Sequence, residues 1–346
     1  MRKGLTLVFA ALLVFTFAAC KGRSGGSSSG GELSGKVVIY TSIYEDVIES
    51  VQRLLNRRFP GNEVEFFYGG TGVIQARVAA EETAGRLGAD MLLVAEPSYS
   101  LELKERGMLH PFAFADVDKL AFEYDPEGYW YPVRISNMTL AFNPEQFNRS
   151  QVPQSFFDFA NNPSLRGAIS MGNPLTSGTT MATITALRDK YGYEYFDALG
   201  RQGVLIESGS VALTKLETGE AIAIMVLEES VLKKREEDNS ALEVIYPTDG
   251  TIVVPSTVAI INENWSANRN TAAAEIVANW FLSHEGQDAI VDGWMHSARS
   301  DFTRLPFDAI PTADIRANSI PVNWENVFRQ RPELRERFEQ LVVARR

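Results

Sequence analysis

The sequence predicts an α/β protein made of two lobes that are joined by two extended segments. Residues 36–106 alternate short apolar runs with stretches of helical periodicity, a pattern typical of parallel strands linked by helices. Residues 167–236 repeat this alternation. Two long extended segments, 131–142 and 251–261, stand on either side of the second series and predict the connections between the lobes.

The first lobe begins with the run KVVIY at residues 36–40, whose β-branched side chains favour a strand. Apolar residues at helical spacing follow, among them Val47, Val51 and Leu55. Strand and helix then alternate twice more. The elements expected are strands 36–40, 63–68 and 90–95 and helices 45–59, 73–82 and 99–106.

The second lobe and the C-terminal region are predicted on the same grounds. The last helix is charged and carries an apolar stripe that includes Leu334 and Phe338. The elements expected are strands 167–170, 204–206 and 221–226, helices 179–190, 211–218 and 229–236, and then helices 271–282, 285–291 and 331–343.

The two extended segments are interpreted as crossovers that form a hinge. The chain would leave the first lobe near Arg134 and return near Ser256, so that a few residues absorb the rotation of lobe closure. This places residues 36–134 plus 256–318 in lobe 1, 135–255 in lobe 2 and 319–346 in a C-terminal helical tail. The alternative is one continuous sheet that contains both segments.

The N-terminal region predicts export. A basic start precedes fifteen almost wholly apolar residues, Leu5 to Ala19, which span about 22 Å as a helix and fall short of a bilayer core of about 30 Å. Residues 1–20 therefore resemble a cleaved signal, and the Gly/Ser-rich residues 21–35 predict a flexible linker.

Cys20 follows Phe17-Ala18-Ala19, and together they resemble the lipobox of bacterial lipoproteins, in which the cysteine is acylated. Phe17 departs from the more usual leucine. We expect an exported protein, lipid-anchored to a bacterial membrane on its periplasmic or extracellular face. The alternative is an ordinary secretory peptide with a chance cysteine.

Composition excludes several classes of function. Cys20 is the only cysteine, which rules out disulfides, thiolate catalysis and cysteine-ligated metal sites in the mature body. The formal net charge of −11 argues against nucleic acid as a partner. Neither G-x-S-x-G nor H-E-x-x-H occurs, and His110, His284 and His296 lack ligand spacing and are expected at surface or boundary positions. We expect neither catalysis nor a cofactor.

Turns rich in hydroxyls and glycine follow the predicted strands of both lobes. Ligands of α/β units bind beyond the carboxyl ends of the strands, where helix N-termini point their N–H groups outward. TSGTT at 176–180 is the strongest candidate for a phosphate or phosphonate, although such residues are also ordinary N-caps, worth about 1 kcal/mol each. The candidates are Thr41, Ser42, Gly70, Thr71, Ser177, Gly178, Thr179, Thr180, Ser208 and Ser210.

Three carboxylates, Glu207, Glu228 and Glu229, also stand at strand ends. They would repel a bare anion and so predict hydroxyl or ammonium groups on the ligand. For Glu228 and Glu229 the alternative is a helix-start pair that the helix dipole favours.

These motifs together resemble the solute-binding proteins of bacterial ABC transporters, in the branch of ferric-ion, hexose-phosphate and aminoethylphosphonate binders. The resemblance covers residues 36 to 300 and rests on VVIYTSIYEDV, GADMLLVAEPSYSLELKERGML, TSGTT, TGEAIAIMVLEES, YPTDGTIVVPSTVAIIN and ANWFLSHEGQDAI. It implies a type II periplasmic-binding-protein fold that closes on a small ligand. It also implies an ABC permease and its ATPase as partners.

The resemblance also bears on the ligand. Ferric binders carry adjacent tyrosines where this chain reads LEES, and the tyrosines at 191, 193 and 195 stand on an apparent packing helix instead. Hexose-phosphate binders carry an acidic pair at the position of Glu228-Glu229, followed by a return like PTDGT at 247–251. Their sugar-facing acid falls near Glu207, but Ile206 stands close to the place of their histidine.

The sequence thus predicts a monomeric binding protein for a phosphorylated or phosphonate solute. TSGTT and Thr41–Ser42 would hold the phosphoryl oxygens, and Glu207, Glu228 and Glu229 the hydroxyl or ammonium groups. The alternatives are a ferric-ion uptake protein, a secreted hydrolase on the same fold, and a ligand sensor without transport.

Overall fold

The computed structural model describes residues 34–345. The expected signal, the lipobox with Cys20 and most of the expected linker lie outside the described residues. Within residues 34–345, no helix combines the length and apolar character that a membrane crossing requires.

Lobe 1 contains a parallel sheet in the order β2-β1-β3, with Ile39 of β1 opposite Phe66 on one side and Met91 on the other. Each strand leads into a helix at its carboxyl end, as the sequence predicts. The elements are β1 (Lys36–Thr41), α1 (Glu45–Arg58), β2 (Glu63–Tyr68), α2 (Thr71–Thr83), β3 (Met91–Val94) and α3 (Pro97–Glu105).

Lobe 2 repeats the arrangement with the parallel order β8-β6-β7. Tyr191 ends α5 and Tyr195 lies within α6, where its buried hydroxyl donates to the Phe156 carbonyl at 2.9 Å, so this tyrosine packs as expected. The elements are α4 (Phe156–Asn161), β6 (Ile169–Gly172), α5 (Gly178–Tyr191), α6 (Glu194–Gln202), β7 (Leu205–Glu207), α7 (Gly209–Thr218), β8 (Ala223–Leu227) and α8 (Glu228–Asp238).

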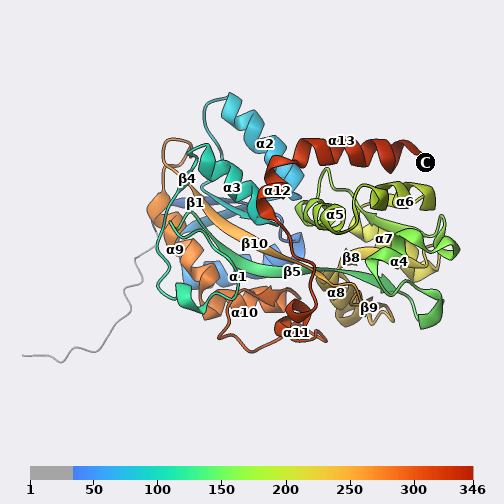
Figure 1. Cartoon of the computed structure of the whole chain (residues 1–346). Coiled ribbons are helices and arrows are strands. Elements are labelled where there is room, and N and C mark those ends of the chain that lie inside the picture. The colour runs from blue at the N-terminus through green and yellow to red at the C-terminus, as the bar shows by residue number, and fades with distance from the viewer. Residues whose placement is uncertain (1–33, 346) are drawn as a thin grey trace, which may run out of the picture. The chain divides into compact units, whose positions relative to one another are not determined.

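The two extended segments form the long strands β5 (Trp130–Phe142) and β10 (Ile252–Ile261), which pair antiparallel along the middle of Figure 1. Because β10 also pairs with β3 and β5 with β8, the hydrogen-bonded order β2-β1-β3-β10-β5-β8-β6-β7 is unbroken. The segments therefore cross between the lobes and also join them into one sheet. The register shifts between Ser256 and Thr257, opposite Arg134 and Pro132, and Pro132 has no N–H to donate to a regular ladder.

Each lobe buries its own apolar core. Val37 and Ile39 lie in one core of lobe 1, against α9 and α10, and Tyr40 and Leu92 lie in another. The core of lobe 2 includes Phe156 and takes in the C-terminal helices (Figure 1). The remaining elements are β4 (Leu109–His110), β9 (Glu243–Ile245), α9 (Thr271–Leu282), α10 (His284–Asp292), β11 (His296–Ser297), α11 (Thr312–Ala317), α12 (Trp324–Arg329), α13 (Arg331–Leu341) and the 3-10 turns Val117–Lys119, Arg149–Gln151, Pro163–Leu165 and Val343–Arg345.

We predict that Phe338→Ala destabilises the protein by about 3–5 kcal/mol, because truncation of a buried aromatic leaves a cavity. Phe338 is buried in the lobe 2 core, with its ring centroid 5.5 Å from that of Phe196. Urea unfolding followed by circular dichroism measures the change. Phe157→Ala is the control, because that side chain is 53% exposed and its loss should cost much less. Equal effects of the two substitutions would show that α13 does not belong to the cooperative core.

Candidate functional site

Arg134 places a positive charge in the middle of the molecule. It lies on β5 and is only 3% exposed. Its Nη2 donates weakly to Ser42, to the carbonyl at 3.4 Å and to Oγ at 3.2 Å, and its Nη1 lies 2.7 Å from Met295 Sδ. Nε has no acceptor among the described residues. Burial lowers the pKa of Arg134, an effect that the nearby Glu229 opposes.

Glu229 brings a carboxylate to the same region from lobe 2. It is 2% exposed, and its Oε1 accepts from Ser136 Oγ of β5 at 2.8 Å. Burial raises the pKa of Glu229 to about 7, while Arg134 and Ser136 act to lower it. Beside it, the hydroxyls of Tyr44 and Ser230 lie 3.0 Å apart and connect lobe 1 to lobe 2. Opposite charges from β5 and α8 are therefore buried together where the lobes touch.

Glu228 differs from its neighbour because its oxygens are already bonded. Asn137 Nδ2 donates to Oε2 at 2.6 Å, His296 Nε2 lies 2.9 Å from the same oxygen, and the Tyr246 hydroxyl donates to Oε1. His296 Nδ1 in turn lies 2.8 Å from Thr312 Oγ1. The expected surface or boundary position of His296 is therefore wrong: it is 1% exposed, because both ring nitrogens have polar partners inside the protein.

The glycine and hydroxyl turns of the two lobes meet at the starts of α2 and α5. The Gly72 N–H donates to the Thr176 carbonyl at 3.0 Å, and a methyl group at Gly178 would lie 2.7 Å from Thr71 Oγ1. Ser177 Oγ accepts from the Thr180 N–H at 3.2 Å as the N-cap of α5. Four sequence-predicted positions, Gly70, Thr71, Ser177 and Gly178, thus lie at one contact between the lobes.

A small cavity at this contact is lined by both helix starts and by Arg331 and Arg335 of α13. Arg331 Nη2 donates to Ser98 Oγ at 2.8 Å, and Nη1 donates to Glu102 at 2.6 Å. Burial raises the pKa of Glu96, another residue of the lining, although Arg331 opposes the shift. Sequence analysis missed Arg331, because the charge pattern of the C-terminal helix does not indicate which residues of the lobes the helix contacts.

Four other candidates, Glu207, Ser208, Ser210 and Thr41, are not brought to these contacts, whereas the Thr179 hydroxyl lies 3.0 Å from Ser177 Oγ at the start of α5. Glu207 accepts from Ser170 Oγ at 3.1 Å and pairs with Lys215. Ser208 caps α7 through the Val211 N–H at 3.4 Å, and its hydroxyl lies 3.2 Å from that of Ser210. All these partners belong to lobe 2. Thr41 Oγ1 accepts from the N–H of Ile43 within its own turn at 3.1 Å.

Three polar residues of β5, Arg134, Ser136 and Asn137, were also missed, although the sequence holds a signal for them. Every residue of β5 is buried, and a strand of this kind is normally a run of apolar side chains. The sequence YPVRISNMTLAF interrupts that run with a charge, a hydroxyl and an amide. Polar groups within a buried strand are thus the sequence signal for this part of the candidate site.

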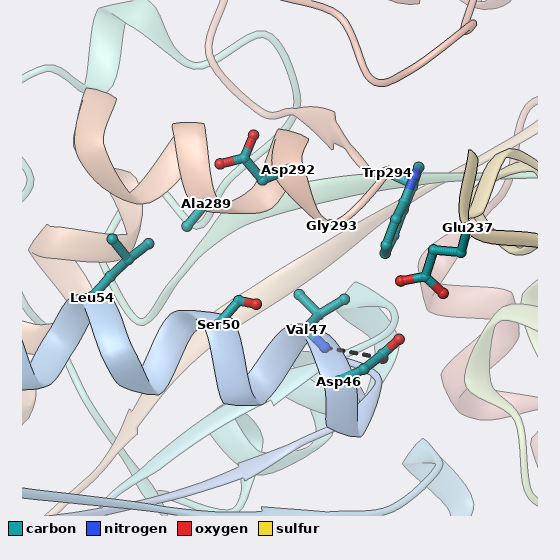
Figure 2. Close-up of a pocket in the computed structure, with 9 residues that line it drawn as sticks. All are labelled: Asp46, Val47, Ser50, Leu54, Glu237, Ala289, Asp292, Gly293 and Trp294. Atoms are coloured by element: carbon teal, nitrogen blue, oxygen red, sulfur yellow. Dashed lines mark hydrogen bonds between the residues drawn. The ribbon is translucent and has the colours of Figure 1, made fainter.

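A second hollow of about 100 Å³ lies between α1, α10 and α8. Figure 2 shows its acidic side chains, Asp46, Glu237 and Asp292, together with Trp294. Lys233 of α8 pairs with Asp46 of α1, and Trp294 Nε1 donates to Glu236 at 2.6 Å. These contacts join the lobes along this edge.

The family model described as bacterial extracellular solute-binding protein matches residues 88–327. The chain is also similar to the probable ABC transporter periplasmic-binding protein y4fP of Sinorhizobium fredii, with 22% identity over 211 residues. That match spans 58% of this chain and 58% of the length of the curated relative.

Solved structures with the same fold include AfuA from Actinobacillus pleuropneumoniae with exogenous fructose-6-phosphate bound. It has 21% identity and a TM-score of 0.77, with 89% of this chain and 99% of that chain covered. Iron-bound HitA from Pseudomonas aeruginosa has 18% identity and a TM-score of 0.76, with coverage of 89% and 99%. The substrate binding protein of an ABC transporter from Agrobacterium tumefaciens has 17% identity and a TM-score of 0.78, with coverage of 92% and 96%. The predicted two-lobed periplasmic-binding-protein fold is confirmed.

We predict that Glu229→Gln flattens part of the pH dependence of stability. From the ordinary pKa of 4.5 up to about 7, the unfolded chain releases this proton while the folded chain retains it. The free energy of unfolding therefore falls as pH rises through that window and levels off above it, by on the order of 3 kcal/mol for this group. Urea unfolding at several pH values measures the slope.

Glu49→Gln is the control for this experiment, because Glu49 is an exposed residue of α1. This variant should keep the slope of the unsubstituted protein. A Glu229→Gln slope equal to that of Glu49→Gln would contradict the raised pKa.

Proposed function

The chain belongs to the bacterial extracellular solute-binding proteins, and we propose that it serves an ABC importer by capturing a small phosphorylated or phosphonate solute. The solute would lie between lobe 1 and lobe 2, with the lobe boundaries near residues 134/135 and 255/256. Closure would bury it, and a membrane permease driven by a separate ATPase would receive it. In this proposal the chain acts as a monomer, by binding and without catalysis.

The meeting of the α2 and α5 N-termini carries the proposal. These helices have 13 and 14 residues, and their starts face each other across the lobes at Thr71 and Gly178. The N–H groups at a helix start favour a phosphoryl oxygen, and the helix dipole adds about 0.3–1 kcal/mol. Because the two helix starts belong to different lobes, a solute bound to both would favour lobe closure.

The carboxylates would receive the other end of the solute. Because Glu228 already accepts from Asn137, His296 and Tyr246, Glu229 is the better acceptor for a hydroxyl or ammonium group. We assign Glu207 a smaller role, since Lys215 and Ser170 occupy its oxygens. Ser42, which contacts Arg134, remains a candidate for the anionic end.

The location of the protein follows the same proposal. An acylated Cys20 and the linker after it would hold the lobes near the permease, where tethering raises their effective concentration. A sensor without transport would use the same binding event. Absence of lipid on the mature N-terminus, by mass spectrometry of the membrane fraction, would refute the anchor alone.

Ferric ion is a second candidate. Iron-bound HitA shares the fold, and Glu228 gathers Tyr246 and His296, which are oxygen and nitrogen donors. Against it, the start of α8 reads LEES without tyrosine. No three His, Asp or Glu side chains within residues 34–345 are grouped in a way that could hold a metal ion.

We predict that calorimetry detects binding of a hexose 6-phosphate or of 2-aminoethylphosphonate, and that Ser177→Ala/Thr179→Ala weakens it by roughly tenfold or more. The double variant removes the two hydroxyls, 3.0 Å apart, at the start of α5. Ser155→Ala is the control, because it removes the N-cap of α4 without touching this contact. Thermal stabilisation by ferric citrate and by neither phosphoryl compound would favour the iron alternative.

We predict that Gly72→Ala weakens solute binding by roughly tenfold or more without unfolding either lobe. A methyl group there would overlap the Leu175 carbonyl oxygen and lie 2.9 Å from Thr176 Cα, so the lobes could not approach as they do. Gly209→Ala at the start of α7 is the control, since a methyl group there meets open space. Equal affinities of the two variants would show that this contact takes no part in closure.

A further inference from the structure

Two buried arginines of this protein differ sharply in their hydrogen bonding. Arg299 is 4% exposed and well bonded: Nε donates to Asp301 at 2.8 Å, Nη1 to the Leu282 carbonyl at 3.0 Å, and Nη2 to Asp116 at 3.1 Å. Arg134 is buried as deeply and, among the described residues, makes no ion pair. The fold is therefore able to satisfy a buried guanidinium and does not do so at Arg134.

The shortfall at Arg134 is specific. A guanidinium carries five N–H donors, and here the acceptors are a thioether sulfur and two oxygens of Ser42 at 3.2 and 3.4 Å. Sulfur is a weak acceptor, and Nε has no acceptor at all within residues 34–345. A buried charge without a bonded partner is strongly destabilising. An unsatisfied buried polar group in a native structure calls for an explanation, and a partner from outside the chain would supply one here.

The surroundings of Arg134 include groups from both lobes. Glu229, Tyr44 and Tyr68 are the charged or titratable groups that act on it. Ser42 approaches from lobe 1, whereas Glu229 belongs to α8 of lobe 2. Tyr68 is 40% exposed, so this cluster extends toward the surface. An anion bound here would touch groups from both lobes.

Arg134 is also connected to the facing helix starts. Ser256 lies opposite Arg134 in the pairing of β10 with β5, and its Oγ donates to the Ala95 carbonyl at 3.3 Å. The Ala95 N–H donates to Thr71 Oγ1 at 3.2 Å, at the start of α2. Ala95 thus links β10, the strand that pairs with β5 at Arg134, to the contact between α2 and α5.

We propose that Arg134 forms the ion pair with the anionic group of the captured solute, while Glu229 accepts a hydrogen bond from a hydroxyl or ammonium group of the same molecule. This role of Arg134 rests on the proposed function, and it adds a positive charge to pair with the anionic group of the solute. The solute is then bipolar, with an anionic oxygen group and a hydrogen-bond donor placed to reach Arg134 and Glu229 together. Since Arg134 stands on the crossover strand, the ion pair also couples binding to lobe contact.

Arg134→Met tests this directly, because the variant keeps an unbranched apolar stem and removes the charged guanidinium. Affinity for a hexose 6-phosphate or for 2-aminoethylphosphonate should fall by roughly 100-fold. The urea midpoint of the solute-free protein should stay unchanged or rise, because an apolar side chain replaces an unpaired buried charge. The affinity of Arg134→Lys should lie between that of the unsubstituted protein and that of Arg134→Met, since lysine keeps the charge but lacks the planar guanidinium.

Arg299→Met is the matched control, with the opposite pattern expected. It breaks a bonded network, so it should lower the urea midpoint and leave the affinity of the folded protein unchanged. If Arg134→Met lowers the midpoint as Arg299→Met does, or binds the solute with unchanged affinity, the proposal is overturned. The midpoint comparison needs no ligand.

The outcomes separate this proposal from the proposed function. Weaker binding in Ser177→Ala/Thr179→Ala together with normal binding in Arg134→Met would overturn the role of Arg134 alone. If the unsubstituted protein binds citrate but neither phosphoryl compound, and Arg134→Met loses that binding, the role of Arg134 stands and the phosphoryl assignment fails.

Discussion

The antiparallel pairing of β5 with β10 is the constraint on which the rest of the structure depends. It runs from Ile252 opposite Met138 to Ala259 opposite Trp130, and it alone carries the hydrogen-bonded sheet from β3 of lobe 1 to β8 of lobe 2. Each strand contributes apolar side chains to a core in both lobes, such as Leu140 to lobe 2 and Val133 to lobe 1. Polar side chains of β5 add contacts between the lobes to this backbone pairing.

The polar side chains of β5 carry a free-energy cost, because burial removes them from water. Arg134, Ser136 and Asn137 bring hydrogen-bonding groups into a fully buried strand, where each must be paired. Ser136 and Asn137 donate to carboxylates at the start of α8, whereas Arg134 contacts Ser42 and the Met295 sulfur and no carboxylate within residues 34–345. Stability alone would favour apolar residues at these positions, and the binding role that we propose for Arg134 would explain one of the exceptions.

Local periodicity predicted most elements, because the apolar spacing that gives a helix its buried face can be seen within a short stretch of sequence. The bounds of α1 and α5, for example, agree with prediction to within about a residue. The meeting of Thr71 with Gly178 was also foreseeable, since helix starts lie beyond the carboxyl ends of parallel strands. Arg331 and His296 were not, because their partners, Ser98 and Glu228, are far away along the chain and only tertiary packing joins them.

The pair Glu228-Glu229 shows why neighbours in sequence need not share a role. Successive residues of a helix point about 100° apart, so the first turn of α8 directs the two carboxylates to different surroundings. Glu228 meets Asn137, His296 and Tyr246, which hold β5, β11 and the segment before β10 together. Glu229 meets one hydroxyl and the unpaired Arg134, and burial raises its pKa to about 7. Glu228 therefore joins three parts of the chain, whereas Glu229 keeps an oxygen available for the solute contact that we propose.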